Sequence, residues 1–145
     1  MKNQMELTND KKQKDAEMGW SSVKAKGLKQ ILLVDDEVRF RILYKNIFKA
    51  IGFKVFTAAN SSDACVLLTD EDIDLIILDI NIAQEDGSVL FRVMRAYRKN
   101  IRVIVSSVYP IDEQQKKIQD ADGYFDKSDN KEVLAMMVCS FLEDS

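Results

Sequence analysis

The chain has 145 residues and a formal net charge of −3; 46% of its residues are hydrophobic and 31% are charged. This length and composition predict one globular domain with a sizeable core, and no apolar run approaches the roughly 20 residues that a membrane span requires. The chain contains no histidine, which excludes histidine-based catalysis and histidine metal ligands.

Charge is distributed unevenly along the chain. Residues 1–29 carry seven lysines and four acidic residues, whereas residues 30–145 carry 14 basic and 20 acidic residues. An acidic body is a poor partner for nucleic acid, so we expect no nucleic-acid binding through it. Residues 1–28 have no clean periodicity and no apolar signal-peptide segment. We interpret them as a flexible or partly helical extension of a cytoplasmic protein, and residues 29–145 as the folded domain.

From Lys29 onward, short apolar runs alternate with segments of helical periodicity. We predict strands in the runs QILLVDD (30–36), FKVFTA (53–58), DLIILD (74–79), IRVIVSS (101–107) and DGYFDK (122–127). We predict helices over 37–52, from Asn60 through ACVLL, and over 88–99, 112–120 and 130–143. The near-helical spacing of Val38, Ile42, Leu43, Ile47 and Ala50 indicates the first helix, which Gly52 ends.

Five strands that alternate with five helices predict an α/β fold. The pattern is that of a doubly wound (βα)5, flavodoxin-like three-layer sandwich with a central five-stranded parallel sheet. In such open sheets, ligands bind outside the carboxyl ends of the strands. The polar residues at those ends are Asp35, Asp36, Asp79, Ser106, Ser107 and Lys127.

The acidic residues at these strand ends suggest a cation site. Burying Asp79 at the end of LIILD costs several kcal/mol unless another group pairs with it. Asp35 and Asp36 are expected to converge on it, and a hard divalent cation with oxygen ligands, Mg²⁺ above all, relieves the repulsion between such carboxylates. Taken singly, each of these residues has an ordinary explanation as a helix cap or a surface charge, but the set at one sheet edge favours a shared site.

The same set of residues suits phosphoryl transfer. Lys127 supplies a positive charge for a phosphate oxygen, and Ser107 supplies a hydroxyl donor. A carboxylate beside Mg²⁺, a lysine and a hydroxyl has the surroundings of a nucleophile that forms an aspartyl phosphate. The sequence therefore predicts that Asp79 is such a nucleophile.

Residues 30–143 resemble the receiver domain of two-component response regulators. The family has an acidic pair after the first strand, here LLVDDE, and a phosphorylated Asp before a loop that ends in Asp-Gly, here LDINIAQEDG. It has Ser or Thr after the fourth strand, here VIVSSV, and Lys after the fifth, here GYFDK. The resemblance implies a phosphorylation-controlled switch rather than a classical enzyme, one that catalyses only its own phosphotransfer and dephosphorylation. It also implies a histidine kinase or phosphotransfer protein as phosphodonor and a downstream protein target.

Residue by residue, the resemblance implies the following roles. Asp79 is the phosphoacceptor, Asp36 binds Mg²⁺ directly, Asp35 assists through water, and the backbone carbonyl of Asn81 is a further metal ligand. Lys127 contacts the phosphoryl group, as does the hydroxyl of Ser107, with Ser106 as the alternative. Tyr124 stands at the position of the aromatic switch residue, and the output surface is the fourth helix, fifth strand and fifth helix.

Three departures from the family pattern concern the loops. Ala83 and Ser128 stand where the family usually has proline. The stretch between Ser107 and Lys127 is short for the family, which predicts a trimmed or irregular fourth helix.

We also expect Asn81 and Tyr109 to flank the path of the water that hydrolyses the phosphorylated state, with Tyr109 shielding it.

Other functions remain open on sequence alone. The chain ends at Ser145, directly after the last predicted helix, which suits a single-domain receiver or one excised from a longer chain, such as a DNA-binding transcription factor. A Mg²⁺-dependent phosphohydrolase of the haloacid-dehalogenase type also uses an Asp after a strand, but it needs a second Asp two residues later. Glu37 follows Asp35 at that distance, and Asn81 follows Asp79. A degenerate receiver that only binds a partner is disfavoured by the intact acidic set.

Overall fold

The computed structural model describes residues 27–82 and 84–143. The predicted extension, apart from residues 27 and 28, and Ala83 lie outside the described residues. The strands are β1 (Gln30–Val34), β2 (Lys54–Ala58), β3 (Leu75–Asp79), β4 (Asn81–Ile82), β5 (Glu85–Asp86), β6 (Arg102–Ser107) and β7 (Gly123–Asp126). The helices are α3 (Val38–Ile51), α4 (Ser61–Asp70), α5 (Gly87–Tyr97), α6 (Ile111–Lys117) and α7 (Lys131–Glu143).

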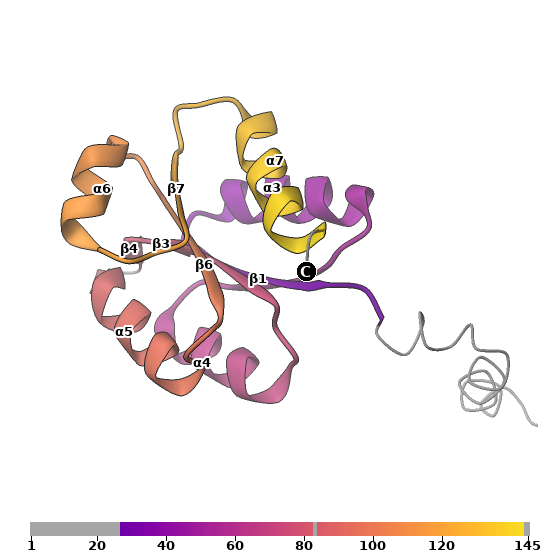
Figure 1. Ribbon diagram of the computed structural model, residues 1–145, viewed down its shortest axis with the longest axis horizontal. Helices are drawn as coiled ribbons and strands as arrows, with labels where there is room; N and C mark the ends of the chain where they lie inside the picture. Colours follow the sequence, from indigo (N-terminus) through magenta and orange to yellow (C-terminus); the bar gives the residue numbers. More distant parts are fainter. Residues whose placement is uncertain (1–26, 83, 144–145) are drawn as a thin grey trace, which may run out of the picture.

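Five of the strands form a parallel sheet in the order β2-β1-β3-β6-β7, which confirms the predicted doubly wound fold. Helices α3 and α7 cover one face, α4 and α5 cover the other, and α6 packs against β7 (Figure 1). Every residue of β3 is buried, as its uninterrupted apolar run predicts for a central parallel strand. The order reverses between β1 and β3, so the crevice at their carboxyl ends is the expected ligand site. No helix in the described ranges combines the length and apolarity needed to cross a membrane.

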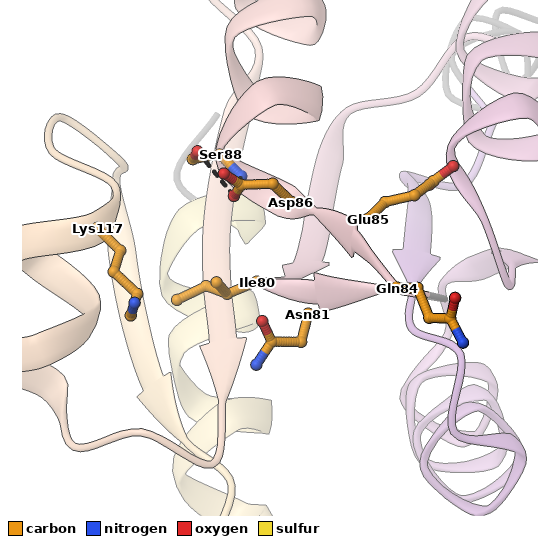
Figure 2. A pocket seen from close by; sticks show the side chains of 7 residues that line it. All are labelled: Ile80, Asn81, Gln84, Glu85, Asp86, Ser88 and Lys117. Carbon is orange, nitrogen blue, oxygen red and sulfur yellow. Dashed lines mark hydrogen bonds between the residues drawn. The ribbon is translucent and has the colours of Figure 1, made fainter.

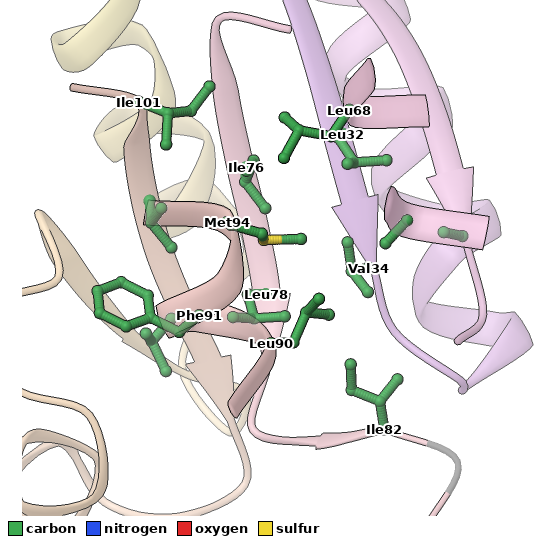
Figure 3. Close-up of a cluster of buried hydrophobic side chains, with 14 of the residues drawn as sticks. Leu32, Val34, Leu68, Ile76, Leu78, Ile82, Leu90, Phe91, Met94 and Ile101 are labelled. Carbon is green, nitrogen blue, oxygen red and sulfur yellow. The ribbon is translucent and has the colours of Figure 1, made fainter. Parts of the chain in front are cut away.

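Two apolar cores hold the sheet between its helices. On the face covered by α4 and α5, side chains of β1 and β3 interdigitate with those of α5 (Figure 3). Leu90 and Met94 of α5 are at most 3% exposed and pack in the same cluster as Leu78 of β3. This packing on both sides fixes the strand that ends in Asp79, because tightly packed interiors leave little room for movement.

The ends of α3 and α4 follow the signals in their sequences. Gly52 ends α3 with φ 119°, and its N–H donates to the carbonyls of Phe48 and Lys49. This left-handed conformation favours glycine, which has no Cβ to clash. The side chain of Asn60 caps α4 by accepting from the amide of Asp63.

The buried face of α3 differs from the one that apolar spacing indicated. Its buried residues are Phe40, Tyr44 and Phe48, whereas Val38 and Ile42 are 54% and 57% exposed. The helix carries two apolar rows, and the aromatic row recurs at every fourth residue. Aromatic side chains bury more apolar area, so that row faces the sheet.

The segment after β3 contains a feature that the sequence did not predict. The short strands β4 and β5 pair in antiparallel fashion directly after Asp79. Ile82 is fully buried and anchors this hairpin, while Gln84 has φ 67°.

Near the other edge of the sheet, helix α6 has only seven residues, which confirms the predicted trimming of the fourth helix. It spans Ile111–Lys117 rather than 112–120.

Candidate phosphoryl-transfer site

Three carboxylates lie together at the carboxyl ends of β1 and β3. Asp35 directly follows β1, and Asp79 is the last residue of β3, in parallel register with it. One carboxylate oxygen each from Asp35, Asp36 and Asp79 lies within 4.8 Å of the other two. Asp35 is 1% exposed and Asp79 is 6% exposed, whereas Asp36 faces solvent. The site therefore concentrates negative charge in a largely buried crevice, with Asp36 at its exposed side.

Lys127 provides the positive charge at the centre of this cluster. Its Nζ lies 2.7 Å from Asp35 Oδ2 and 3.3 Å from Asp79 Oδ2. The more exposed Glu37, to which the sequence analysis gave no role in the site, lies 3.6 Å from the same ammonium. The amide of Lys127 donates to the carbonyl of Ser107 at 2.8 Å, which ties the residue to the end of β6. Only 9% of its side chain is exposed, so its ion pairs are well shielded from solvent.

The pKa values show that one lysine does not fully compensate the buried acids. Burial raises the pKa of Asp79 to about 6, and the charge of Asp35 adds to this effect while Lys127 opposes it. Burial also raises the pKa of Asp35, against the hydrogen bond and charge of Lys127. Burial on its own would lower the pKa of Lys127, but Asp35 and Asp79 outweigh it and leave that pKa raised. The ammonium is thus held charged, and a further cation at the carboxylates would favour their ionised forms.

The donors of the cluster suit a hard divalent cation. All three candidate side-chain ligands are carboxylates, and the described residues around them offer no sulfur or imidazole ligand. Mg²⁺ prefers oxygen ligands of this kind and keeps several waters. Buried carboxylates whose negative charge is not fully compensated have raised pKa values, as Asp35 and Asp79 do.

The two candidate serines occupy different positions at the end of β6. Ser106 stands opposite Asp79 in the strand register, and its buried hydroxyl has no hydrogen-bond partner among the described residues. Ser107 is the last residue of the strand and is fully buried. Its Oγ accepts a hydrogen bond from the amide of Tyr109 at 3.2 Å. Ser107 thus connects the site to the loop before α6.

Asn81 and Tyr109 contact each other beside Asp79. The amide of Asn81 donates to Asp79 Oδ1 at 3.2 Å, and its side-chain Nδ2 donates to the hydroxyl of Tyr109 at 3.4 Å. The ammonium of Lys117 lies 5.0 Å from the centre of the Tyr109 ring. A pocket of about 590 Å³ opens next to them, between α6 and the β4–β5 hairpin (Figure 2). Water can therefore approach this side of the crevice.

Tyr124 of β7 is half-buried and bound to the connection between α6 and β7. Its hydroxyl donates to the carbonyl of Ile118 at 2.7 Å and accepts from the amide of Ala121 at 3.2 Å. Its ring packs against the core on the α4 and α5 side of the sheet. The predicted switch residue is thus hydrogen-bonded to the end of α6 rather than free on the surface.

The sequence analysis assigned no role to two residues of the site. Gln114 of α6 is fully buried, and its Nε2 donates to the carbonyls of Tyr109 and Phe125, each at 2.8 Å. It links the loop after Ser107 to β7, and a single glutamine in a polar helix gives no hint of this. Gly87 follows the loop after Asp79, and a Cβ there would lie 2.6 Å from the carbonyl oxygen of Asp79. The Asp-Gly at the end of that loop was the available signal for such a close approach.

Comparison with known proteins places this geometry in a family. A family model described as the response regulator receiver domain matches residues 31–138. Sporulation initiation phosphotransferase F of Bacillus subtilis is 39% identical over 80 residues, which is 55% of this chain and 64% of that protein. Aerobic respiration control protein ArcA of Escherichia coli K12 is 40% identical over 65 residues, 45% of this chain and 27% of that protein. These alignments span less than two thirds of either relative.

Solved structures agree over most of the chain. The response regulator TrrA of Thermotoga maritima, in complex with Mg²⁺-BeF, superposes with a TM-score of 0.73 at 30% identity and covers 79% of this chain and 100% of that one. A CheY-like receiver domain protein of Methanospirillum hungatei gives a TM-score of 0.75 at 25% identity, covering 81% and 96%. The chain belongs to the response regulator receiver domains, the phosphorylation-controlled switches of two-component signalling.

Proposed function

We propose that Asp79 accepts the phosphoryl group, from a histidine kinase or a phosphotransfer protein in the cytoplasm. The observation that carries this proposal is a buried carboxylate with a pKa of about 6, held 3.3 Å from a lysine ammonium and beside two further carboxylates. Such a group is mostly ionised at neutral pH and is a competent nucleophile. An oxygen of Asp79 forms the bond to phosphorus while the donor's bond to phosphorus breaks, and the donor keeps that electron pair.

Mg²⁺ is the metal that this donor set favours. We assign Asp36 and Asp79 as side-chain ligands, Asp35 as a ligand through water, and Asn81 as a ligand through its backbone carbonyl. The three clustered carboxylates support this assignment, and so does the Mg²⁺-BeF complex of the TrrA neighbour. When bound, the ion neutralises charge on the transferring phosphoryl group. The chain's own residues hold and orient that group.

Lys127 and Ser107 are assigned to the phosphoryl oxygens. Lys127 is already held beside Asp79, so its ammonium needs little movement to donate to a phosphoryl oxygen. We prefer Ser107 to Ser106 because it lies one residue beyond the pair that Asp79 forms with β6, at the strand end where the phosphoryl group projects. Its Oγ accepts from Tyr109, which leaves its own proton available to donate. If phosphorylation still shifts the amide resonances of Ser107→Ala but no longer shifts those of Ser106→Ala, Ser106 rather than Ser107 contacts the phosphoryl group.

The switch is proposed to run from Ser107 through its loop to Tyr124. A phosphoryl group that draws the Ser107 hydroxyl strains the bond to the Tyr109 amide and shifts the loop before α6. Tyr124 is bound to the far end of α6, so it responds to the same movement. The output surface is α6, β7 and α7, for a downstream protein target. Two packings that differ by a few kcal/mol suffice, because the phosphoryl group biases an existing equilibrium.

The chain is proposed to act as a regulator that catalyses only its own phosphorylation and dephosphorylation. A phosphohydrolase of the haloacid-dehalogenase type is not favoured, since neither Asp35 nor Asp79 is followed by the required second Asp. Residues 1–28 are proposed as an extension outside the receiver domain. No nucleic-acid or membrane partner is proposed for the domain, since residues 30–145 carry 20 acidic against 14 basic residues.

A labelling experiment tests the acceptor. The full chain is incubated with acetyl phosphate and Mg²⁺, and the extent of labelling is followed with time. Wild type should take up one phosphoryl group, and both chelation of the metal and Asp79→Asn should abolish uptake, since an amide is not a competent nucleophile. Ser88→Ala, on the surface of the neighbouring pocket, is the matched control and should label normally. Equal labelling of Asp79→Asn and wild type would refute the assignment.

A further inference from the structure

We infer that Phe40 is a positioning residue for Lys127: the face of its ring holds the ammonium at the acceptor carboxylate. The inference rests on the proposed function. The ammonium of Lys127 lies 4.5 Å from the centre of the Phe40 ring, well within the range of a cation–π contact. Phe40 is 9% exposed, and so is the side chain of Lys127, so the contact is largely desolvated.

The ion pairs around Lys127 do not by themselves direct it to the acceptor. Its Nζ is closer to Asp35, at 2.7 Å, than to Asp79, at 3.3 Å, and Glu37 adds a third carboxylate. A lysine ammonium is a compact charge on a flexible stem, and it turns readily from one carboxylate to another. The Phe40 ring attracts the ammonium without a formal charge of its own. It therefore keeps the ammonium where it reaches Asp79 as well as Asp35.

Phe40 is itself held rigidly relative to the strand that carries Lys127. Its ring packs on Tyr44 with centroids 4.4 Å apart, and Tyr44 meets Phe125 of β7 edge-on at 6.3 Å. Phe125 is two residues before Lys127. Phe40, Tyr44 and Phe125 thus form a continuous stack of rings from the ammonium to β7. This packing holds the Phe40 ring in a fixed position relative to Lys127.

A pocket that Lys127 helps to line makes this support necessary. A pocket of about 360 Å³ is lined by Phe40 and Lys127 together with Asp129 and Glu132. These two carboxylates offer alternative partners for the lysine away from Asp79. Without the aromatic ring, the stem is free to turn toward them, and the acceptor loses its nearby cation for part of the time.

Rates of phosphorylation by acetyl phosphate test this role. Phe40→Leu should lower the rate about tenfold, which corresponds to about 1.4 kcal/mol and lies within the range of a desolvated cation–π contact. Phe40→Tyr and Phe40→Trp keep an aromatic face and should retain at least half of the wild-type rate. Phe53→Leu removes a ring that is 8% exposed and lies in the same core cluster as Phe40 but outside the stack of rings that reaches Lys127, and it should leave the rate unchanged.

A double-mutant cycle separates positioning from loss of packing. If Phe40 acts through the ammonium, Phe40→Leu should have no further effect on the rate in the background of Lys127→Met. A general loss of stability would instead lower the rate by the same factor in both backgrounds. That result, or a wild-type rate in Phe40→Leu, would overturn the inference.

Nuclear magnetic resonance of the unphosphorylated protein gives a readout that does not depend on activity. The ε-methylene protons of Lys127 should show an upfield ring-current shift in wild type and Phe40→Tyr. The shift should disappear in Phe40→Leu and persist in Phe53→Leu. Its absence from wild type would overturn the inference, even if Phe40→Leu fails to fold. If the shift is present but wild type takes up no phosphoryl group, the proposed function fails while the contact stands.

Discussion

Replacing Asp79 with asparagine should stabilise the folded protein, although it removes the proposed phosphoacceptor. Asp79 is 6% exposed, and burial with the charge of Asp35 raises its pKa from 3.8 to about 6. The folded state therefore binds this proton more tightly than the unfolded state does. The cost of the ionised carboxylate is absent below pH 3.8 and fully present above the folded-state pKa. A difference of about two pKa units corresponds to about 3 kcal/mol at neutral pH.

Urea unfolding without divalent cations measures this cost. At about pH 7.5, the free energy of unfolding of Asp79→Asn should exceed that of wild type by about 3 kcal/mol. At about pH 5 the gain should fall to roughly half, because wild-type Asp79 is then mostly protonated in the folded state. The matched control is Asp72→Asn, an exposed carboxylate at the opposite end of β3, whose stability should stay within about 0.5 kcal/mol of wild type at both pH values.

These unfolding measurements test whether Lys127 alone balances the negative charge of the site. If Asp79→Asn is no more stable than wild type at neutral pH, then Lys127 already compensates the acid completely. A gain that does not change with pH would show that the substitution acts through packing rather than charge. Either result would refute the reasoning that the site needs a further cation.

Three further predictions concern the metal, the acceptor loop and the lifetime of the phosphorylated state. Asp36→Ala should weaken Mg²⁺ binding far more than Glu37→Ala in calorimetry, since only Asp36 is assigned as a ligand; equal affinities would contradict the acidic site. Gly87→Ala should lower stability by about 1–3 kcal/mol, because its Cβ meets backbone oxygens at 2.5 and 2.6 Å, and an unchanged thermal midpoint would disprove the clash. Tyr109→Ala should speed loss of phosphate and Asn81→Arg should slow it at fixed Mg²⁺; unchanged decay in both would show that water enters elsewhere.

The course of the central strand was predictable because a parallel strand buried on both faces has a distinctive sequence. The run that ends in Asp79 has no polar interruption, and β3 is buried throughout. Acids after two such strands must meet if the strands are neighbours, as β1 and β3 are. The cap at Asn60 and the stop at Gly52 were predictable for a similar reason, since each depends on local backbone chemistry.

Contacts that depend on tertiary packing could not be predicted from the sequence. The β4–β5 hairpin has two residues in each strand, too few for any periodicity to show. On α3, two apolar rows competed, and only packing against the sheet selects the aromatic one. The cation–π contact of Phe40 and Lys127 joins residues from distant segments, so no local pattern announces it.

The most direct test of the account is to locate the phosphoryl group on the chain. The protein is phosphorylated with acetyl phosphate and Mg²⁺ and treated with borohydride, which reduces an aspartyl phosphate to homoserine, and its peptides are sequenced by mass spectrometry. The account predicts homoserine at position 79 alone, and none when Mg²⁺ is chelated. Homoserine at position 35 or 36 instead, or an unmodified Asp79 in a protein that has gained phosphate, would contradict it.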